Sequence, residues 1–318
     1  MKDTMEPCRV IEPELVALAG GEASAAGAAR VEAHVARCGS CRDALSRYRE
    51  LEGELGELRA TAPPGADPTL ARAELAQRLA DLRSRLVGYG VYPSPLGPIL
   101  IARSELGVSM VEYLEPGTDP RRAGLGKLAG TDAVEAREVT EPLYRDVLDY
   151  LAGRRTDLGW PLDLRWTRSD FQRQVLEATA RLPYGAVTSY AGIAREIGQP
   201  HATRAVAQAL RHNPVPIVVP CHRVIGSSGA LTGYAGKRVD LKRQLLAVEG
   251  VRADARIDRA AMYVRYLHES AYCMPTCGAL PTEPLSNLTL FGRRERAEAA
   301  GLVPCSDCRP DLHPLPPI

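Results

Sequence analysis

The chain of 318 residues contains no run of 18 apolar residues, so no segment of it is expected to span a membrane. Its first residues, MKDTMEPCRVIEPE, mix acidic and basic side chains and lack the apolar core of a secretory signal peptide. No internal repeat at a solenoid period is visible. The hydrophobic fraction of 45% and the charged fraction of 25% are typical of soluble globular proteins. We therefore expect a cytoplasmic protein of two or three domains.

Eight cysteines are present, and disulfides are rare in the cytoplasm. Metal binding or nucleophilic chemistry is the better interpretation of such residues. They also form groups along the chain: Cys8, Cys38 and Cys41 near the start, Cys221 alone, and then Cys273, Cys277, Cys305 and Cys308.

The net charge of +1 hides a segregation of charge along the chain. Residues 1–60 carry 8 basic and 11 acidic side chains, whereas residues 171–249 carry 10 basic and 4 acidic ones. Residues 273–318 carry 4 basic and 5 acidic side chains. Because phosphate contacts dominate nucleic-acid affinity, only the middle segment suits a polyanion. A basic face that is merely solvated is an equal alternative.

Turn residues divide the chain into three modules. The stretch ATAPPGADP, residues 60–68, predicts a linker because its prolines and glycine cannot continue a helix, and a short helix follows it. The β-prone runs of YPSPLGPILIARSELGVSMVEYLEP predict a hairpin of strands. Apolar residues recur at helical spacing over 142–151 and 170–182. We expect the central module to be the largest and to be mixed α/β.

A pair of short helices is predicted before residue 214. The stretch HATRAVAQALRHNP, residues 201–214, carries one apolar stripe of Ala202, Ala205, Val206, Ala209 and Leu210. The preceding SYAGIAREIGQP supplies another helix and a turn, so the pair is typical of a helix-turn-helix, although a plain amphipathic pair would look similar. The other side of the second helix suits close approach to a nucleic acid and carries Thr203, Arg204, Ala207, Gln208 and Arg211.

The stretch PIVVPCHRVIG, residues 216–226, places Cys221 after an apolar, strand-like run and directly before His222 and Arg223. A free thiol is only about 3% ionised at pH 7, so a cysteine nucleophile needs a base or a cation beside it. His222 is such a base, and Arg223 is equally suited to bracing the site structurally. An inert buried cysteine at the end of a strand is the alternative.

The segment from Phe171 to Gly250, centred on PCHRV, resembles the O6-alkylguanine-DNA alkyltransferases, or methylated-DNA–protein-cysteine methyltransferases. Upstream, SPLGPILIARSELGVSMVEY is similar to the family's N-terminal β-sheet subdomain. The resemblance implies an α/β multidomain fold with a helix-turn-helix (winged-helix-like) core. The implied parts are a helical zinc domain of anti-sigma type (1–60), a linker and helix (61–86), the N-terminal subdomain (87–168), the catalytic DNA-binding domain (169–252) and a four-cysteine zinc domain (253–318).

The resemblance also implies the chemistry. Cys221 would take the alkyl group from the guanine oxygen in one in-line displacement, and each molecule would act once because the thioether is stable. His222 would remove the thiol proton, through a water, while Glu249 orients the imidazole. Tyr190 would donate a proton to the departing guanine. Asn213 matches a hinge that ties the DNA-binding helix to the active-site strand.

The substrate base lies inside a duplex, so it must be rotated out at a cost of a few kcal/mol. The resemblance implies that Arg204 fills the space left behind and that the second helix enters the minor groove, unlike the usual major-groove docking. Small residues such as Ala207 on the exposed face of that helix agree with a close approach to the minor groove. Tyr234 would belong to a loop covering the base pocket. Further phosphate contacts are expected from Arg211, Arg173 and Lys237.

The first cysteine group lies in RVEAHVARCGSCRDAL, which places His34, Cys38 and Cys41 at i, i+4 and i+7. On one helix these would face the same way and suit zinc, with Cys8 as the fourth ligand. The segment resembles the zinc-binding anti-sigma fold, whose members bind a partner protein. The following apolar positions, Leu45, Tyr48, Leu51, Leu55 and Leu58, would offer a contact surface. A domain that zinc merely stabilises is the alternative.

The second group, Cys273, Cys277, Cys305 and Cys308, has the pattern C-x3-C, 27 residues, C-x2-C, a strong zinc signal. The segment resembles the metal-binding domain of the adaptive-response alkyltransferases. There the first cysteine, here Cys273, also accepts a methyl group from DNA phosphotriesters. The stretch GALPTEP lacks the arginines found in that family, so phosphotriester repair stays open.

The favoured function is direct repair of O6-alkylguanine, and also O4-alkylthymine, in double-stranded DNA by irreversible transfer to Cys221. No membrane is involved. Zinc would be structural, and the transfer itself would need no cofactor. One alternative is an alkylation-responsive regulatory protein that binds a sigma factor through residues 1–60. Another is a cysteine hydrolase using Cys221, His222 and Glu249, which would turn over repeatedly.

Overall fold

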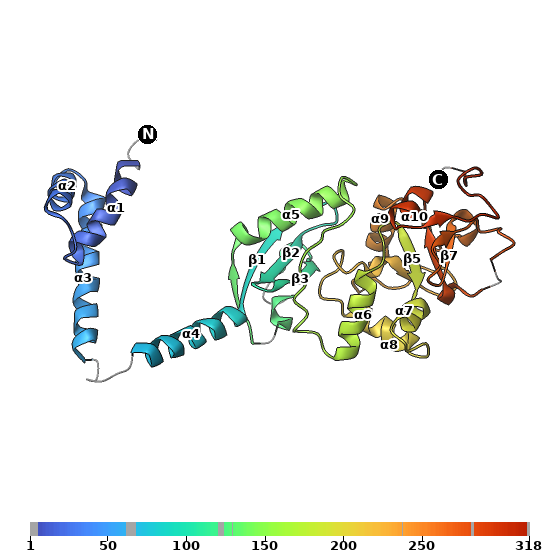
Figure 1. The fold of residues 1–318 in the computed structure, drawn as a ribbon, viewed down its shortest axis with the longest axis horizontal. Helices are drawn as coiled ribbons and strands as arrows, with labels where there is room; N and C mark the ends of the chain where they lie inside the picture. The colour runs from blue at the N-terminus through green and yellow to red at the C-terminus, as the bar shows by residue number, and fades with distance from the viewer. Residues whose placement is uncertain are drawn as a thin grey trace. The chain divides into compact units, whose positions relative to one another are not determined.

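The computed structural model describes residues 6–61, 68–119, 124–128, 130–236, 238–280 and 283–316 (Figure 1). The chain divides into two compact units, Met1–Arg78 and Leu79–Ile318, each with its own hydrophobic core. Among the described residues, no helix combines the length and the apolar character needed to cross a membrane.

The first unit is helical. Its helices α1 (Glu6–Ala19), α2 (Ala25–Val35) and α3 (Gly39–Thr61) pack around Leu15, Val31 and Leu45, which are nearly inaccessible to solvent. The hydroxyl of Ser24 caps α2 by accepting a hydrogen bond from the Gly27 amide at 3.2 Å. Helix α4 (Pro68–Arg85) follows the predicted linker, as the sequence indicates.

After the end of α4, the second unit has a four-stranded sheet of order β3-β2-β1-β4, of which Figure 1 labels β1, β2 and β3. The predicted hairpin is confirmed, because β2 and β3 pair antiparallel through a two-residue loop. Helix α5 packs on β1 and β2. The elements are β1 (Leu86–Tyr92), β2 (Ile99–Ser104), β3 (Gly107–Tyr113), the short helix η1 (Leu125–Lys127), β4 (Asp132–Glu135) and α5 (Arg137–Leu151).

The helix-turn-helix pair is present as α7 and α8, preceded by α6 and β5. Serine caps fix two of the helix starts: Ser169 accepts from the Gln172 amide at 3.2 Å, and Ser189 accepts from the Gly192 amide at 3.0 Å. The second cap places Tyr190 at the first position of α7. The elements are α6 (Asp170–Ala180), β5 (Ala186–Ser189), α7 (Tyr190–Glu196) and α8 (Thr203–Arg211).

The apolar stripe predicted for α8 is narrower than expected. Val206, Ala209 and Leu210 are buried, but Ala205 is exposed. At 100° per residue, Ala205 lies at the edge of the stripe that the other three define, so it does not reach the core. The exposed side of α8 is correspondingly wider.

The apolar run before Cys221 is not a strand, contrary to the prediction. Residues 214–220 form an irregular segment with one isolated bridge between Pro216 and Val219. Three of its seven residues are prolines, which lack the amide hydrogen that a sheet ladder needs. Cys221 itself opens the short helix η2 (Cys221–Arg223), followed by β6 (Val224–Ile225) and α9 (Val239–Val248).

The C-terminal residues, predicted as a separate domain over 253–318, share a sheet with the preceding part of the chain, because β7 and β9 join β5 and β6. The sheet has the order β6-β5-β9-β7, and β5 pairs antiparallel with β9 through Ala186 and Phe291. A small sheet of β8 and β10 follows. The elements are η3 (Arg259–Ala261), β7 (Tyr263–Tyr266), β8 (Ala271–Tyr272), η4 (Leu285–Asn287), β9 (Leu288–Phe291), α10 (Arg294–Ala299) and β10 (Val303–Pro304). The predicted α/β class, with mixed sheets and helices, is confirmed.

A glycine substitution tests the packing of the first sheet. Gly107 has φ +148°, and a Cβ there would lie 2.3 Å from the Pro161 carbonyl oxygen. Gly97 also has positive φ, but a Cβ there meets nothing within 4 Å. We expect Gly107→Ala to lose about 1–3 kcal/mol more unfolding free energy than Gly97→Ala, because only the first adds a backbone clash. The two tryptophans, Trp160 and Trp166, make urea unfolding of this region visible by fluorescence. Equal losses would contradict the packing described.

Candidate active site and zinc centres

Cys221 is almost buried, with 8% of its surface exposed, and its sulfur is held by Asn213. The Asn213 side-chain amide donates to the Cys221 sulfur at 3.2 Å and to the Val219 carbonyl at 2.9 Å. The Val215 amide in turn donates to the Asn213 side-chain oxygen at 3.0 Å. One side chain thus ties the end of α8 to the thiol, at the position where the hinge was predicted.

His222 is completely buried and is oriented by Glu249. Its Nε2 lies 2.6 Å from a carboxylate oxygen of Glu249. The ionised carboxylate can only accept, so Nε2 carries the hydrogen and Nδ1 is the basic nitrogen of the neutral ring. Nδ1 is buried and has no hydrogen-bond partner among the described residues. Burial lowers the pKa of His222, and Glu249 partly offsets that effect.

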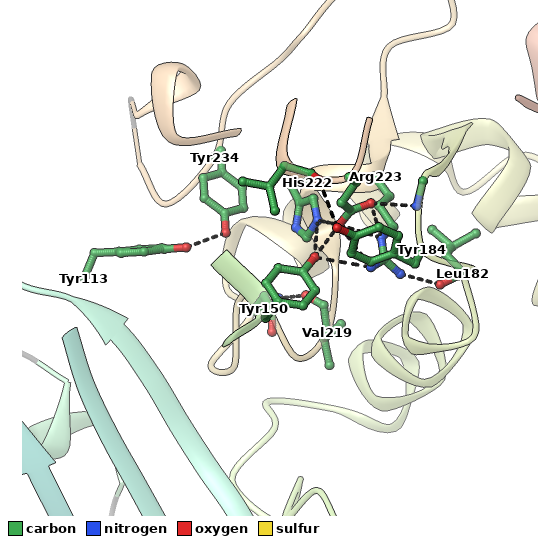
Figure 2. Close-up of polar contacts among 12 residues, drawn as sticks. Tyr113, Tyr150, Leu182, Tyr184, Val219, His222, Arg223 and Tyr234 are labelled. Atoms are coloured by element: carbon green, nitrogen blue, oxygen red, sulfur yellow. Dashed lines mark hydrogen bonds and ion pairs between the residues drawn. The ribbon is translucent and has the colours of Figure 1, made fainter. Parts of the chain in front are cut away.

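Glu249 is held as a carboxylate by several donors, of which Tyr150, His222 and Arg223 are labelled in Figure 2. The Arg223 Nε donates to one oxygen at 2.9 Å, and the Arg223 Nη2 donates to the other at 3.0 Å. The Gly185 amide donates at 2.9 Å, and the Tyr150 hydroxyl donates a short hydrogen bond. Burial alone would raise the pKa of Glu249, but His222 and Arg223 lower it to about 2. The group is therefore ionised throughout the neutral range.

Arg223 braces the site, the structural role that the sequence analysis suggested for it. It is 6% exposed, and besides its contacts to Glu249 its Nη1 donates to the Leu182 carbonyl at 2.5 Å. Its guanidinium is thus occupied by the carboxylate and the backbone behind the site.

Tyr150 was missed by the sequence analysis. It belongs to α5, and its hydroxyl contacts Glu249 and lies 3.5 Å from His222 Nε2. The only sequence signal is a tyrosine on the apolar face of an amphipathic helix, which normally indicates core packing. Its role depends on a contact across 99 residues of chain.

A cavity of about 500 Å³ opens onto Cys221. It brings together side chains that were predicted from separate motifs, and its wall includes Cys221, Tyr190, Tyr234, Ala207, Gln208 and Arg211. The Tyr190 hydroxyl accepts from Thr232 at 3.2 Å, and burial raises the pKa of Tyr190. The hydroxyls of Tyr234 and Tyr113 lie 2.9 Å apart (Figure 2). A phenol with a raised pKa keeps its proton at neutral pH and is able to donate it.

Lys242 is a second functional candidate that the sequence analysis missed. It is completely buried on α9, where its ammonium donates to the carbonyls of Val224 at 2.5 Å and Thr232 at 3.2 Å. It lies 5.9 Å from the centre of the Tyr190 ring. Burial lowers the pKa of Lys242 to about 8, opposed by Cys221. A lysine within the apolar positions of VDLKRQLLAV was the available signal.

The remaining predicted DNA contacts lie outside the cavity. Arg204 is exposed near the start of α8, and Thr203 is half-buried beside it. Arg173 is exposed and pairs with Asp170 at 3.2 Å. Lys237 lies outside the described residues. The cavity and the exposed side of α8 are joined by Arg211, which belongs to both.

The first zinc cluster forms, but not on a single helix as predicted. Its donor atoms, from Cys8, His34, Cys38 and Cys41, all lie within 4.8 Å of one another. Helix α2 ends at Val35 and α3 begins at Gly39, so the chain turns between His34 and Cys41 and each ligand comes from a different local structure. Tetrahedral zinc with Zn–S bonds of about 2.3 Å requires sulfurs about 3.8 Å apart. The Cys8 and Cys38 sulfurs lie 3.8 Å apart, so the donor set fits the ion.

The second cluster brings together Cys273, Cys277, Cys305 and Cys308, again within 4.8 Å. The sulfurs of Cys277 and Cys305 lie 4.0 Å apart, close to the tetrahedral value. No disulfide joins any of the eight cysteines, all of which lie in the described part of the chain. Cys273 is 6% exposed, which leaves little of its surface open to solvent. The predicted zinc ligands therefore converge at both ends of the chain.

Family models match four stretches of the chain. Residues 170–251 match the DNA binding domain of 6-O-methylguanine DNA methyltransferase, and residues 87–164 match its ribonuclease-like domain. Residues 251–311 match the metal binding domain of Ada, and residues 8–42 match a zinc-finger model. The match over residues 170–251 contains every residue that lines the cavity at Cys221, the match over 87–164 contains Tyr150, and the other two matches contain the zinc clusters.

Curated relatives agree with these matches. A methylated-DNA–protein-cysteine methyltransferase of Mycobacterium tuberculosis is 39% identical over 170 residues, or 54% of this chain and 96% of the relative. One from Methanosarcina acetivorans is 39% identical over 163 residues (51% and 97%), and the constitutive enzyme of Bacillus subtilis is 38% identical over 164 (51% and 95%). A crystal structure of the Mycobacterium tuberculosis O6-methylguanine methyltransferase covers 53% of this chain and 96% of its own, with 39% identity and a TM-score of 0.44. The chain belongs to the methylated-DNA–protein-cysteine methyltransferase family.

The low pKa of Glu249 predicts a pH-dependent contribution to stability. Its folded-state pKa of about 2 lies below the usual value of 4.5, so the contribution is complete above pH 4.5 and is lost as pH falls towards 2. The shift corresponds to free energy on the order of 3 kcal/mol. We expect the stability difference between the wild type and Glu249→Gln to be constant from pH 5 to 7 and to shrink below pH 4.5. Urea unfolding at each pH measures it, and a difference that grows on acidification would contradict the assignment.

The two clusters predict two zinc ions per chain. Cys41→Ser and Cys305→Ser should each remove one ion, because each takes one ligand from a four-ligand site. Cys221→Ser is the matched control and should keep both. Metal analysis of the purified full chain by mass spectrometry gives the count. A wild type that holds fewer than two ions, or a Cys221→Ser variant that loses one, would argue against these ligand sets.

Proposed function

We propose that this chain repairs O6-alkylguanine in DNA by moving the alkyl group irreversibly onto the Cys221 sulfur, with O4-alkylthymine as a second substrate. The observation that carries the proposal is the Cys221 thiol in the wall of a cavity beside α8, next to a histidine that Glu249 orients. Family membership supports this activity, and it is a single-turnover methyltransferase activity because the thioether has no route back to the thiol.

The buried thiol explains why the site needs a base. Burial raises the pKa of Cys221, so the thiol is protonated at neutral pH. His222 Nδ1 takes that proton through a bridging water, while Nε2–H keeps its bond to Glu249. The developing imidazolium is stabilised by the ionised carboxylate. The Asn213 amide and the nearby Lys242 ammonium both favour the thiolate.

The displacement then has a donor for its leaving group. As the bond from sulfur to carbon forms, the bond from carbon to the guanine oxygen breaks, and negative charge moves onto the base. Tyr190 lines the cavity and holds its proton at neutral pH, so it is placed to neutralise that charge. Tyr234, on the 230–236 loop, closes another wall of the same cavity.

Double-stranded DNA is the proposed macromolecular partner, and α8 is the proposed contact. Rotating a base out of the stack costs a few kcal/mol. The exposed Arg204 would fill the space left behind, while Thr203, Ala207, Gln208 and Arg211 approach the backbone and the groove. The small Ala207 side chain, at the edge of the cavity, permits a close approach.

We propose a structural role for zinc at both ends of the chain and none in the transfer itself. Bound zinc would cross-link segments that carry little apolar core of their own. For the C-terminal cluster, the low exposure of Cys273 supports this role over acceptance of a methyl group from phosphotriesters. The cytoplasmic location remains a prediction.

The regulatory alternative is not favoured. The zinc-finger model that would support it matches only residues 8–42 of this chain. By contrast, this chain covers 96% of the Mycobacterium tuberculosis methyltransferase. The apolar positions predicted as a contact surface on α3 are divided, since Leu45 is buried while Leu51 and Leu55 are exposed. Leu58 lies among the side chains that are not described. A sigma factor therefore remains only a suggested partner.

A stoichiometric transfer experiment tests the proposal. Full-length protein mixed with a duplex that carries one O6-methylguanine should gain one methyl group, located on Cys221 by peptide mass spectrometry. Cys221→Ser should gain none, and His222→Gln and Glu249→Gln should transfer about 10²–10⁴ times more slowly because they lose the base or its orientation. An unmodified duplex is the control. Repeated turnover on an ester would favour the hydrolase, and a folded wild type without methyl on Cys221 would overturn repair.

A further inference from the structure

The Glu249 carboxylate rests on a short backbone segment that precedes β5. The Gly185 amide donates to Glu249 Oε2 at 2.9 Å. The Tyr184 hydroxyl donates to the Val248 carbonyl at 2.9 Å. Residues 184 and 185 therefore fix the Glu249 carboxylate and the backbone carbonyl of the residue directly before it.

The residues that follow the 169–252 region, here called the C-terminal zinc module (253–280 and 283–316), pack directly on this segment. The Gly292 amide donates to the Gly185 carbonyl at 3.2 Å, next to the pairing of Ala186 with Phe291. A Cβ at Gly292 would lie 2.4 Å from the Gly250 carbonyl oxygen. A Cβ at Gly185 would lie 2.8 Å from Arg296 Cγ. Gly292 therefore allows its backbone to pack against that of Gly250, and Gly185 allows its backbone to pack against the Arg296 side chain.

One side chain of the module reaches the aromatic ring at the centre of this contact. The Arg296 guanidinium, on α10, lies 4.5 Å from the centre of the Tyr184 ring. The same ring meets Tyr150 edge-on at 5.6 Å, and the Arg223 guanidinium lies 5.7 Å from its centre. Figure 2 shows Tyr184 beside Tyr150 and Arg223, the two side chains that bind Glu249. Arg296 is thus one residue removed from the groups that hold the catalytic carboxylate.

We propose that Arg296 is a positioning residue for alkyl transfer at Cys221, acting through Tyr184 and Gly185 on Glu249 and His222. This rests on the proposed function. The C-terminal module then forms part of the repair site as well as carrying a zinc cluster. Arg296 also lines a cavity of about 470 Å³ together with Tyr150, Tyr184 and Arg223. Removal of its side chain opens a route for water from that cavity towards Glu249.

The ionisation of Cys221 is the readout that separates positioning from general stability. Arg296→Ala loosens the wall behind Glu249 and admits water, so the low pKa of buried His222 rises and its base form is lost at higher pH. The acid limb of Cys221 reactivity should therefore move to higher pH. The ionisable groups that face His222 are Glu249, Tyr150, Arg223, Lys242, Tyr234 and Cys221, and all remain in the variant.

The experiment measures the rate at which iodoacetamide alkylates Cys221 in the full chain from pH 5 to 9, with the modified peptide identified by mass spectrometry. It needs no DNA, so it succeeds or fails separately from the repair reaction. For Arg296→Ala we expect a rate about three- to tenfold lower at pH 7 and an acid limb shifted to higher pH, the range that loss of a cation–π contact gives. Arg296→Lys keeps a cation over the ring and should recover most of the rate.

Arg294→Ala is the matched control. Arg294 lies on the same helix, but its guanidinium donates to the Asp311 carbonyl at 3.0 Å within the module and does not contact Tyr184. We expect its rate and pH profile to equal those of the wild type. An unchanged profile in Arg296→Ala, or the same change in Arg294→Ala, would overturn the inference. The methyl-transfer assay on the same variants then tells apart the two proposals: a wild type that reacts with iodoacetamide but accepts no methyl refutes repair alone.

Discussion

A single buried charge organises the active site. The Glu249 carboxylate is 1% exposed, and an uncompensated carboxylate in such a place costs several kcal/mol. Its donors come from α5, from the segment before β5 and from η2, and these parts are far apart in the chain. Removing any one of them leaves part of the charge unpaired. The need to neutralise this group therefore fixes how three parts of the fold meet.

The same burial that strengthens these contacts works against the nucleophile. Burial raises the pKa of Cys221, so an isolated thiol there would be inert. Its ionisation depends on a proton acceptor whose orientation is already fixed, and Glu249 fixes it through His222 Nε2. A buried Lys242 with a pKa of about 8 keeps a positive charge near the thiol at neutral pH. The cavity opens onto a buried thiol, and Glu249, His222 and Lys242 together are the groups that favour ionisation of that thiol.

The sequence predicted the parts of the site that lie within short motifs. PCHRV contains Cys221, His222 and Arg223, and apolar spacing predicted the helices α6 and α8. Tyr150 and Lys242 could not be found in this way. Each occupies an apolar helix face, where a tyrosine or lysine usually packs with its polar end at the surface. Only the contacts that α5 and α9 make in the folded chain reveal their partners.

Two incorrect predictions have local causes. Three prolines prevent the strand expected before Cys221, and the end of α2 at Val35 separates His34 from Cys41. Cys221 still lies in the cavity wall. The donor atoms of the first cluster still lie within 4.8 Å of one another, because metal ligands can come from separate helices and turns that the fold brings together. Spacing therefore predicted which cysteine and histidine side chains come together, but for the first cluster it did not predict the local structure that carries them.

The position of β5 shows why the C-terminal module belongs to the catalytic fold. β5 lies between β6 and β9, and Ser189 at its end caps the helix that begins with Tyr190. Without β9, this four-residue strand would be a sheet edge with unpaired backbone groups directly before Tyr190, a side chain of the cavity wall. The edge is short, so two hydrogen-bonded residue pairs cover much of it. Tyr190 and Glu249 are thus both supported by the segment that β9 and α10 cover.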